Sequence, residues 1–465
     1  MADDNIKPGT TVRWSASAIG WALGAEAMIG AFRWVYLGCL RVGSECGGFC
    51  GRGLRVGRKY GIICGVMDIG EIIHEMAVRA RCAAGALRKL STDEKNLLLL
   101  QMADCLEEDR EKIFAANEKD IAAAKESGIS AAMVDRLRLT EGRFASMVEG
   151  VRFVATLANP VGEIIWERER PSGIRIRKVR EPFGVVAVVF ESRPNVFVDT
   201  AALCLKAGNA IILRGGKEAI ESNKALAESV GRALGEMVDA VQLVKVLDHA
   251  AVREMVRSVG LIDVAIPRGG ERLIRAMCEA ALIPVLKHYK GVCHIYVDGA
   301  ADLGMAMRII ENAKVQRPSA CNACECVLVS TAVADEFLPR LEEWAKGAGV
   351  KLHRDGAGVE YLGLEMNVAV VKNVDEAIEY VNTNSSHHSD AIVTGDKSAA
   401  EKFLRDVDSA CVYHNASTRF TDGAEFGMGA EIGISTDKLH ARGPMGLEEL
   451  TTYKYVIEGE GTVRK

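Results

Sequence analysis

The sequence predicts an α/β protein built from two doubly wound domains. Its 465 residues are more than one ordinary hydrophobic core holds, so at least two domains are expected. From about residue 185 to residue 412, short apolar runs typical of buried strands alternate with amphipathic helical segments. Two of these runs end in glycine-rich turns that lead into helices, an arrangement typical of nucleotide-binding parallel sheets.

The composition is that of a soluble globular protein, with 49% hydrophobic and 26% charged residues. A formal net charge of −5 argues against a general nucleic-acid or membrane-surface binder. The 13 cysteines are scattered through helical and strand-like segments, as expected for reduced thiols rather than for a disulfide framework. These features together predict a cytoplasmic protein.

Residues 1–66 differ in texture from the rest of the chain, with three of the five tryptophans and closely spaced glycines. Ile19–Leu40 is apolar enough to suggest a membrane span or signal sequence, but it contains Glu26 and Arg33. We expect residues 1–66 to be a non-native or disordered extension outside the working fold, with a natural start near Met67. A mobile extension and an organelle-targeting piece remain open alternatives.

From Met67 the apolar residues recur at three- and four-residue spacing, which predicts amphipathic helices. The three predicted helices are Ile69–Lys89, Asp93–Ala124 and Thr140–Ala158. After them, Ile174–Val179 alternates as a strand with one polar face.

The first predicted sheet belongs to a cofactor domain spanning residues 67–288. Its strand candidates, separated by helices, are 185–190, 210–213, 241–247 and 263–266. Glycine turns follow the second and fourth strands, and neither is a G-x-G-x-x-G fingerprint. The predicted cofactor-binding residues are Arg214, Gly215, Gly216, Lys217, Gly269 and Gly270.

The charges at the first turn favour NADP over NAD. Arg214 and Lys217 precede the first acidic residue, Glu218, and a 2′-phosphate needs cations whereas a 2′-hydroxyl is typically bound by a carboxylate. Two solvated basic side chains in a loop are the alternative interpretation.

A second α/β block, residues 289–414, is predicted as the catalytic domain. Its strand candidates are 292–297, 326–330, 366–371 and 391–394. The stretch Gln316–Glu325 interrupts it, because Pro318 ends the helix 301–315. Cys321 therefore lies at a forced break where it can face a cleft, and Arg317 is close enough in sequence to favour its thiolate form. A small buried core cysteine is the alternative.

These residues belong to a longer series of ordered blocks. The series includes Glu191–Asn195, Cys204–Lys217, Ile266–Gly270, Gly291–Asp298, Gln316–Asn322, Asn415–Phe420 and Leu439–Leu447. On these blocks the chain from about Met67 onward resembles the γ-glutamyl phosphate reductases, a proline-pathway family within the aldehyde dehydrogenase superfamily. Residues 1–66 have no counterpart in the resemblance.

The resemblance implies NADPH-dependent reduction of L-glutamyl 5-phosphate to L-glutamate 5-semialdehyde and phosphate. Cys321 falls at the nucleophile position, where its thiolate would form a thioester with the acyl group. The implied fold is aldehyde-dehydrogenase-like, with residues 415–465 returning to the cofactor domain and supplying a tail. That tail and the strand near 174–179 would form a small β oligomerisation arm. A homo-oligomer and a transient contact with glutamate 5-kinase follow from the same resemblance.

Further site residues are assigned through the resemblance. Asn322 follows the nucleophile, and its backbone or that of Cys321 is a candidate oxyanion donor. Arg193 and Arg317 are expected to contact phosphate or carboxylate, because guanidinium binds both in a bidentate manner. Asn195 lies on the predicted oxyanion-side loop. The remaining predicted substrate contacts, for the glutamyl α-carboxylate, are Ser417, Thr418 and Arg419. A structural arginine is the alternative for each arginine.

The direction of the reaction has a separate indication. Oxidising aldehyde dehydrogenases carry a Glu-Leu-Gly-Gly motif whose glutamate activates the deacylating water, but the corresponding stretch here, Leu286–Gly291, has no carboxylate. Its absence fits reduction of an acyl phosphate. The rivals are an oxidising or CoA-acylating relative and a catalytically silent scaffold that binds the pathway's kinase.

No metal is expected. Cys321-x-x-Cys324 could be half of a zinc site, but no second pair at ligand spacing follows, and His387-His388 lies in a different segment. His294 lies within an apolar run and is expected to be a core histidine rather than a general acid.

Overall fold

A computed structural model describes residues 54–57, 61–64 and 68–464. The chain forms two compact units, Met1–Met67 and Asp68–Lys465. In the first unit, strand β1 (Leu54–Gly57) pairs antiparallel with β2 (Gly61–Cys64). The remainder of residues 1–66, including the apolar stretch 19–40, lies outside the described residues, so its assignment as an extension stays a prediction.

The predicted cofactor domain is built on a four-stranded parallel sheet in the order β7-β6-β5-β8. Its strands are β5 (Val185–Phe190), β6 (Ala210–Arg214), β7 (Val241–Leu243) and β8 (Val264–Arg268). Every residue of β5 and β6 is buried, as expected for strands covered by helices on both faces. The chain adds β6 and β7 on one side of β5 and then crosses to add β8 on its other side. The sheet therefore has a topological switch point between β5 and β8, where nucleotides bind in such folds.

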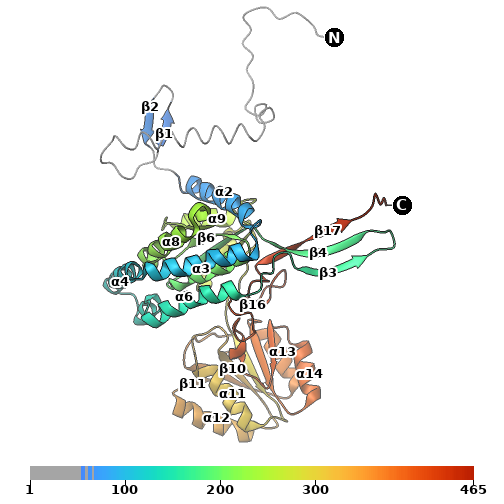
Figure 1. The fold of residues 1–465 in the computed structure, drawn as a ribbon. Helices are drawn as coiled ribbons and strands as arrows, with labels where there is room; N and C mark the ends of the chain where they lie inside the picture. The colour runs from blue at the N-terminus through green and yellow to red at the C-terminus, as the bar shows by residue number, and fades with distance from the viewer. Residues whose placement is uncertain (1–53, 58–60, 65–67, 465) are drawn as a thin grey trace, which may run out of the picture. The chain divides into compact units, whose positions relative to one another are not determined.

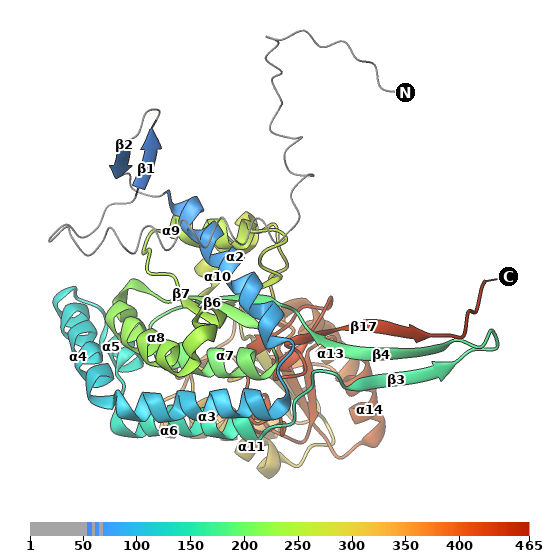
Figure 2. The same cartoon turned by 45° about the horizontal axis from the view of Figure 1, so that its top comes forward.

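Two helical layers cover this sheet. The helices are α2 (Ile69–Leu87), α3 (Thr92–Glu108), α4 (Arg110–Glu126), α5 (Ala131–Leu137), α6 (Glu141–Thr156), α7 (Asn195–Lys206), α8 (Ile220–Leu234), α9 (His249–Arg257) and α10 (Glu271–Ala280). Figures 1 and 2 show α3, α6, α7 and α8 together, with α2, α9 and α10 packed as a separate group. The predicted single helix 93–124 is wrong, because Asp109 leaves helical geometry and separates α3 from α4.

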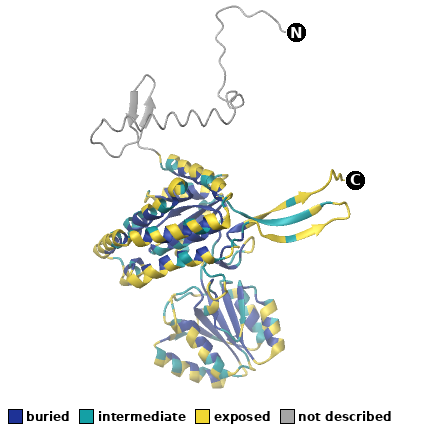
Figure 3. Ribbon diagram, in the orientation of Figure 1, coloured by how far each residue is buried: buried dark blue, intermediate teal, exposed yellow. Residues whose placement is uncertain are grey.

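The catalytic domain has a six-stranded parallel sheet in the order β11-β12-β10-β9-β13-β14. Its strands are β9 (Cys293–Val297), β10 (Cys324–Ser330), β11 (Lys351–His353), β12 (Glu365–Val371), β13 (Ser389–Val393) and β14 (Cys411–His414). Its helices are α11 (Leu303–Val315), α12 (Ala334–Ala348), α13 (Val374–Asn384) and α14 (Lys397–Asp406). The predicted pair of doubly wound α/β domains is therefore present, and both sheets are buried at their centres (Figure 3).

The C-terminal segment, residues 415–464, packs on the cofactor domain and then supplies the last strand of a β ribbon. Its residues Ile432, Met445, Leu447 and Leu450 pack into the hydrophobic core of the cofactor domain. The last strand, β17 (Thr451–Glu458), then pairs antiparallel with β4 (Arg175–Pro182), which pairs with β3 (Ile164–Glu169). This three-stranded ribbon, called the arm below, projects from the cofactor domain and is largely exposed (Figures 1 and 3). A short pair, β15 (Gly433–Ser435) and β16 (Gly443–Met445), precedes it.

None of the helices in the described part of the chain combines the length and apolar character needed to cross a bilayer. The nine cysteines from Cys82 onward are all free.

A buried ion pair closes the break between α11 and β10. Lys314, in the last turn of α11, donates to Glu325 of β10 at 2.9 Å, and both side chains are fully buried. Glu325 also accepts from the backbone N–H groups of Tyr361 and Leu362. The pair therefore fixes both ends of the loop that carries Cys321.

We expect Glu325→Gln to destabilise the protein by about 3–5 kcal/mol, because it leaves the Lys314 ammonium buried without a counter-charge. The free energy of unfolding in guanidinium chloride measures the effect. Glu336→Gln, which removes one partner of the exposed Arg340–Glu336 pair, is the matched control and should change stability little. Equal stability of Glu325→Gln and wild type would contradict the assignment.

Candidate active site

The loop that carries Cys321 lies at the amino edge of the catalytic sheet. Parallel strands begin at the same edge, so the residues that precede or start β9, β10 and β13 come together there. Cys293 opens β9, and its Sγ donates to the carbonyl oxygen of Cys321 at 3.3 Å. His388 immediately precedes β13, and the side chain of Cys324, which opens β10, points into the core instead.

Close backbone packing holds Cys321 from the other side. A Cβ added at Gly291 would collide with the backbone carbonyl of Cys321, so only glycine allows this approach. The N–H of Gly291 donates to the Glu360 carboxylate at 2.7 Å. The Glu360 carboxylate therefore lies near the loop that carries Cys321. It does not belong to the Leu286–Gly291 stretch, and one of its oxygens accepts the Gly291 N–H.

Two histidines flank the Cys321 thiol. The side chains of His288, Cys321 and His388 each place a nitrogen or sulfur within 4.8 Å of the others. The imidazoles of His288 and His388 meet edge to face, with ring centroids 5.5 Å apart. His388 does lie in a different segment of the sequence, but the inference that it is therefore far from Cys321 is wrong. The two residues meet because their segments reach the same edge of the sheet.

The two imidazoles are held in defined orientations. His288 Nδ1 donates to the carbonyl oxygen of Ile434 at 2.8 Å, which leaves Nε2 free. His388 is fully buried, with Nδ1 at 2.9 Å from Ser389 Oγ and with no hydrogen-bond partner at Nε2 among the described residues. Burial lowers the pKa of His388 to about 4, so its ring is neutral at physiological pH.

The Asn322 side chain and the 417–421 turn brace the loop that carries Cys321. The Asn322 side chain donates to the carbonyl oxygen of Thr421 at 2.8 Å and accepts from the Arg419 guanidinium. Thr418 is fully buried, and its hydroxyl donates to the Asn322 carbonyl oxygen at 2.7 Å. Arg419 also donates to Gln316 at 3.0 Å.

These contacts revise the predicted roles. Ser417 is buried and accepts from the Arg419 N–H, and neither Ser417 nor Thr418 lines the cationic cleft described below, so the structure favours a bracing role over the predicted α-carboxylate contact. The side chain of Asn322 is likewise engaged. The backbone N–H groups of Cys321 and Asn322 have no acceptor within the described residues, so they remain candidate oxyanion donors.

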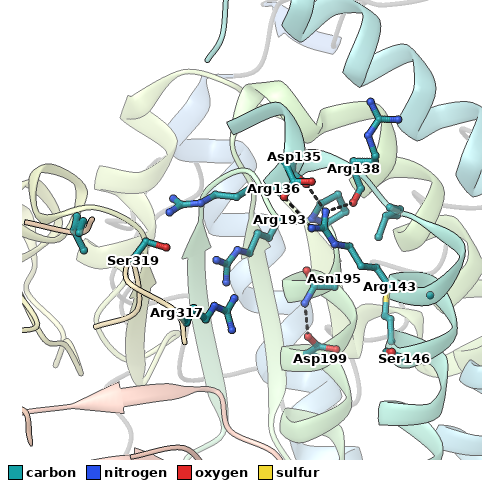
Figure 4. A pocket seen from close by; sticks show the side chains of 15 residues that line it. Asp135, Arg136, Arg138, Arg143, Ser146, Arg193, Asn195, Asp199, Arg317 and Ser319 are labelled. Carbon is teal, nitrogen blue, oxygen red and sulfur yellow. Dashed lines mark hydrogen bonds and ion pairs between the residues drawn. The ribbon is translucent and has the colours of Figure 1, made fainter. Parts of the chain in front are cut away.

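A strongly cationic cleft of about 830 Å³ borders this loop. The predicted substrate residues Arg193, Asn195 and Arg317 all line it, together with Ser319 of the loop before Cys321, which was not predicted. Figure 4 shows the guanidinium groups of Arg193 and Arg317 close to each other. Burial and the neighbouring Arg317 lower the pKa of Arg193 from its ordinary value, because burial and like charges both disfavour the charged form. A bound anion would relieve that repulsion.

Sequence reasoning missed other residues of the cleft. Arg136, Arg138 and Arg143 reach it from α5 and the start of α6, and Arg143 pairs with Asp135 at 2.9 Å. No ion pair involves Arg136, Arg193 or Arg317 within the described residues. The only signal in the sequence was a run of basic residues near 136–143, which by itself indicates a solvated helix end.

An acidic cavity adjoins the cationic cleft. This smaller cavity, about 240 Å³, is lined by the carboxyl groups of Asp199, Asp422 and Glu431, and Asp199 lines both. Asn195 donates to Asp199 at 2.8 Å. Burial raises the pKa of Asp199 to about 6, against the opposing effects of Asn195 and Arg268. The two cavities together present separate positive and negative regions.

The predicted cofactor turns lie at the carboxyl edge of the cofactor sheet. Gly215 and Gly216 follow β6, and Gly269 and Gly270 follow β8 at the amino end of α10. A Cβ at Gly269 would lie 2.6 Å from the Glu191 carboxyl carbon and 2.7 Å from Leu273 Cδ2, so any larger residue there would displace these two side chains. A Cβ at Gly270 would meet nothing within 4 Å, so this helix start faces open space. The N–H of Gly270 donates to the Glu191 carboxylate at 3.1 Å, and the N–H groups of the helical turn that follows suit a pyrophosphate.

One cofactor residue is oriented differently from the prediction. Arg214 is buried, and its guanidinium donates to the carbonyl oxygen of Leu247 at 2.6 Å, so it stabilises the chain after β7. Lys217 is exposed. The cation available to a cofactor phosphate at this turn is therefore Lys217 rather than Arg214.

His294 is confirmed as a core residue. It lies in β9 with no exposed surface, and its Nδ1 is 2.9 Å from Asp390, which also accepts from Ser385 and Ser409.

Comparison with known proteins agrees with the fold and with the sequence blocks. The model of the Aldehyde dehydrogenase family matches residues 63–359 and 348–456. The chain is 48% identical over 418 residues to gamma-glutamyl phosphate reductase from Thermodesulfovibrio yellowstonii, covering 86% of this chain and all of that protein. It is 49% identical over 418 residues to the protein of the same name from Geotalea daltonii, with the same coverage of both chains.

Solved structures of similar proteins also have the fold of this chain. The crystal structure of gamma-glutamyl phosphate reductase from Thermotoga maritima is 44% identical and superposes with a TM-score of 0.83, covering 84% of this chain and all of that one. An acetylating aldehyde dehydrogenase from Geobacillus thermoglucosidasius, 17% identical with a TM-score of 0.63, covers 85% of this chain and 98% of its own, and shares the fold.

Proposed function

This chain belongs to the aldehyde dehydrogenase family, and we propose that it reduces L-glutamyl 5-phosphate to L-glutamate 5-semialdehyde and phosphate, a step of proline biosynthesis. The observation that carries the proposal is the position of Cys321. Its loop borders a cleft with four arginines, Arg136, Arg138, Arg193 and Arg317, that lack a carboxylate partner among the described residues. A nucleophile beside an anion-binding cleft suits an acyl phosphate, which carries its leaving group as an anion.

The proposed chemistry begins with attack of Cys321 Sγ on the acyl carbon. The bond between that carbon and the phosphate oxygen breaks, phosphate leaves, and the acyl group remains as a thioester on Cys321. The unpartnered N–H groups of Cys321 and Asn322 are placed on the same loop, where they could stabilise the oxyanion. Arg193 and Arg317 would hold the phosphate before and during its departure.

The bracing of the Cys321 loop would serve this chemistry by fixing the positions of the oxyanion donors. Asn322, Thr418 and Arg419 tie the loop to the 417–421 turn, so the oxyanion donors need no reorganisation at the moment of reaction. These three are positioning residues in the proposal, acting through the backbone on either side of Cys321.

A nicotinamide cofactor fits the carboxyl edge of the cofactor sheet, and NADPH is the proposed form. The start of α10 at Gly270 opens onto free space that a pyrophosphate could occupy, and Lys217 supplies the cation that a 2′-phosphate would need. When bound, such a cofactor supplies the hydride that reduces the thioester carbonyl.

The substrate is also a zwitterion at its α-carbon, which matches the two cavities. Asp199 is the proposed partner of the α-ammonium group, because it lines both the cationic cleft and the acidic cavity. Arg136 and Arg143 are proposed for the α-carboxylate, since they line the same cleft from α5 and α6. These replace the predicted carboxylate contacts at the 417–419 turn.

A homo-oligomer is proposed through the arm. Three antiparallel strands without a core of their own are marginal in water, yet Tyr453, Tyr455 and Ile457 of β17 are exposed. A transient contact with glutamate 5-kinase stays a prediction, and the cytoplasm is the proposed compartment, in keeping with the free cysteines.

The function is tested by running the reaction backwards. Purified protein should reduce NADP⁺ in the presence of pyrroline-5-carboxylate and phosphate, faster than it reduces NAD⁺, and Cys321→Ala should lose roughly a thousandfold or more of that rate. An oxidising relative would not require phosphate, a CoA-acylating one would require CoA, and a silent scaffold would show no rate. Equal activity of wild type and Cys321→Ala would refute the thioester.

The Asp199 assignment predicts a pH dependence. Its carboxylate is ionised above a pKa of about 6, so the KM for the semialdehyde should rise as pH falls through 6, where the ammonium contact is lost. Asp199→Asn should raise KM at pH 7.5 by roughly tenfold or more and remove this dependence. Because the pH-dependent cyclisation of the substrate affects both proteins equally, their KM ratio isolates Asp199. A constant ratio from pH 5 to 8 would contradict the assignment.

If the arm holds the oligomer together, substitutions on its exposed apolar face should lower the molar mass of the protein in solution. The double variant Tyr455→Lys/Ile457→Lys should lower the molar mass measured by light scattering, because it places two charges on the exposed apolar face of β17. Val259→Lys, at a comparably exposed apolar residue of the cofactor domain, should leave the mass unchanged. A wild-type protein that is monomeric at all concentrations would exclude the proposal.

A further inference from the structure

The cluster of His288, Cys321 and His388 is more than the proposed chemistry uses. The steps proposed above, attack by Cys321 on an acyl phosphate and loss of phosphate, assign no role to an imidazole, yet two rings converge on the thiol. Among the residues that the structure describes, this is the one group of three His, Cys, Asp or Glu side chains whose ligand atoms approach this closely.

We propose that His288, Cys321 and His388 form a Zn²⁺ site that blocks the nucleophile, so that zinc is a reversible inhibitor of this protein. Thiolate sulfur and imidazole nitrogen are the ligands that Zn²⁺ prefers, and three protein ligands leave a fourth tetrahedral position for water. The inference that zinc inhibits the protein rests on the proposed function, in which Cys321 is the nucleophile. The metal site does not depend on that function.

The orientation of the rings favours a metal. In each histidine Nδ1 is engaged, by the Ile434 carbonyl in His288 and by Ser389 Oγ in His388, which leaves Nε2 as the free nitrogen. A metal-binding histidine is typically fixed by such a hydrogen bond from its other nitrogen. The Nε2 of His388 is fully buried with no partner in the described part of the chain, a cost that a metal ligand bond would remove.

The distances and charges are compatible with one ion. Ligand atoms around a tetrahedral Zn²⁺ lie about 3.5 Å apart, so the observed spread of up to 4.8 Å closes with a shift of about 1 Å in the part-exposed Cys321 and His288 side chains. The carboxylates of Glu360, Asp390 and Glu431 are close enough to act electrostatically on His388. Their negative charge favours a divalent cation nearby.

Binding exchanges one proton for the metal. Zn²⁺ takes the place of the proton on the Cys321 thiol, the proton passes to the buffer, and no atom changes oxidation state. A sulfur bonded to zinc in this way has its lone pair committed and cannot attack the acyl carbon. A chelator that removes the ion restores the thiol and, with it, the activity.

Cobalt substitution tests the site without relying on activity. Titration of the reduced full-length protein with Co²⁺ should produce a near-ultraviolet sulfur-to-metal charge-transfer band and the visible bands of a tetrahedral ion, and Zn²⁺ should abolish both. Cys321→Ser should lose the charge-transfer band. His288→Ala should weaken binding by more than the roughly 10- to 100-fold that loss of an outer-shell partner costs.

Matched controls separate this site from adventitious binding. His353→Ala removes a histidine of the catalytic domain that stacks on Tyr361, away from the cluster, and should leave the Co²⁺ affinity unchanged. If the buried His388→Ala variant does not fold, the part-exposed His288→Ala variant carries the test. Absence of the charge-transfer band in folded wild type, or its persistence in Cys321→Ser, would overturn the metal site.

The activity readout is independent. Zn²⁺ should inhibit the phosphate-dependent reduction of NADP⁺, EDTA should reverse the inhibition, and His288→Ala should shift the inhibiting Zn²⁺ concentration upward at least tenfold relative to His353→Ala. A cobalt band in a protein without reductase activity would support the site and refute the proposed function. Reductase activity that zinc does not affect would refute the inhibition while leaving the function intact.

Discussion

The buried ion pair between Lys314 and Glu325 fixes the two ends of the loop that carries Cys321. Eleven residues apart in sequence, these side chains meet at 2.9 Å without exposed surface, one at the end of α11 and the other in β10. Such a pair contributes little net stability, but it is costly to break, so the loop between them has few alternative conformations. Glu325 extends the constraint by holding the N–H of Leu362, a residue that lines the cationic cleft.

Between these two ends, Cys321, the proposed nucleophile, is held through its backbone rather than through its side chain. Gly291 packs directly on the Cys321 carbonyl, Cys293 donates to the same oxygen, and Thr418 donates to the next one along the chain. The thiol itself is left facing the imidazoles of His288 and His388. The polar side chains of the loop make the bracing hydrogen bonds, so the backbone N–H groups of Cys321 and Asn322 stay available to a developing oxyanion. Electrostatic stabilisation of a transition state requires such pre-positioned donors.

Charge is divided across the site in a way that suits a substrate with several charges. Arginines from α5, the start of α6, the loop after β5 and the Cys321 loop face one cavity, while carboxylates from α7 and the glycine-rich 422–431 segment face its neighbour. Asp199 lies in both, and its raised pKa reflects the low polarity of that position. The same neighbourhood places negative charge near His388, which links substrate recognition to the metal site inferred above.

The sequence by itself determined the alternation of strands and helices, the glycine turns and the break at Pro318, because each follows from local periodicity or from the covalent geometry of one residue. The ordered motifs identified the family and, with it, Cys321. The helix break at Asp109, the inward turn of Arg214 and the bracing by Thr418 were decided by the tertiary structure, since they depend on neighbours far away in the chain. The same holds for His288 and His388. Which strands share a sheet edge determines which residues meet at it, and no local pattern in the sequence encodes that.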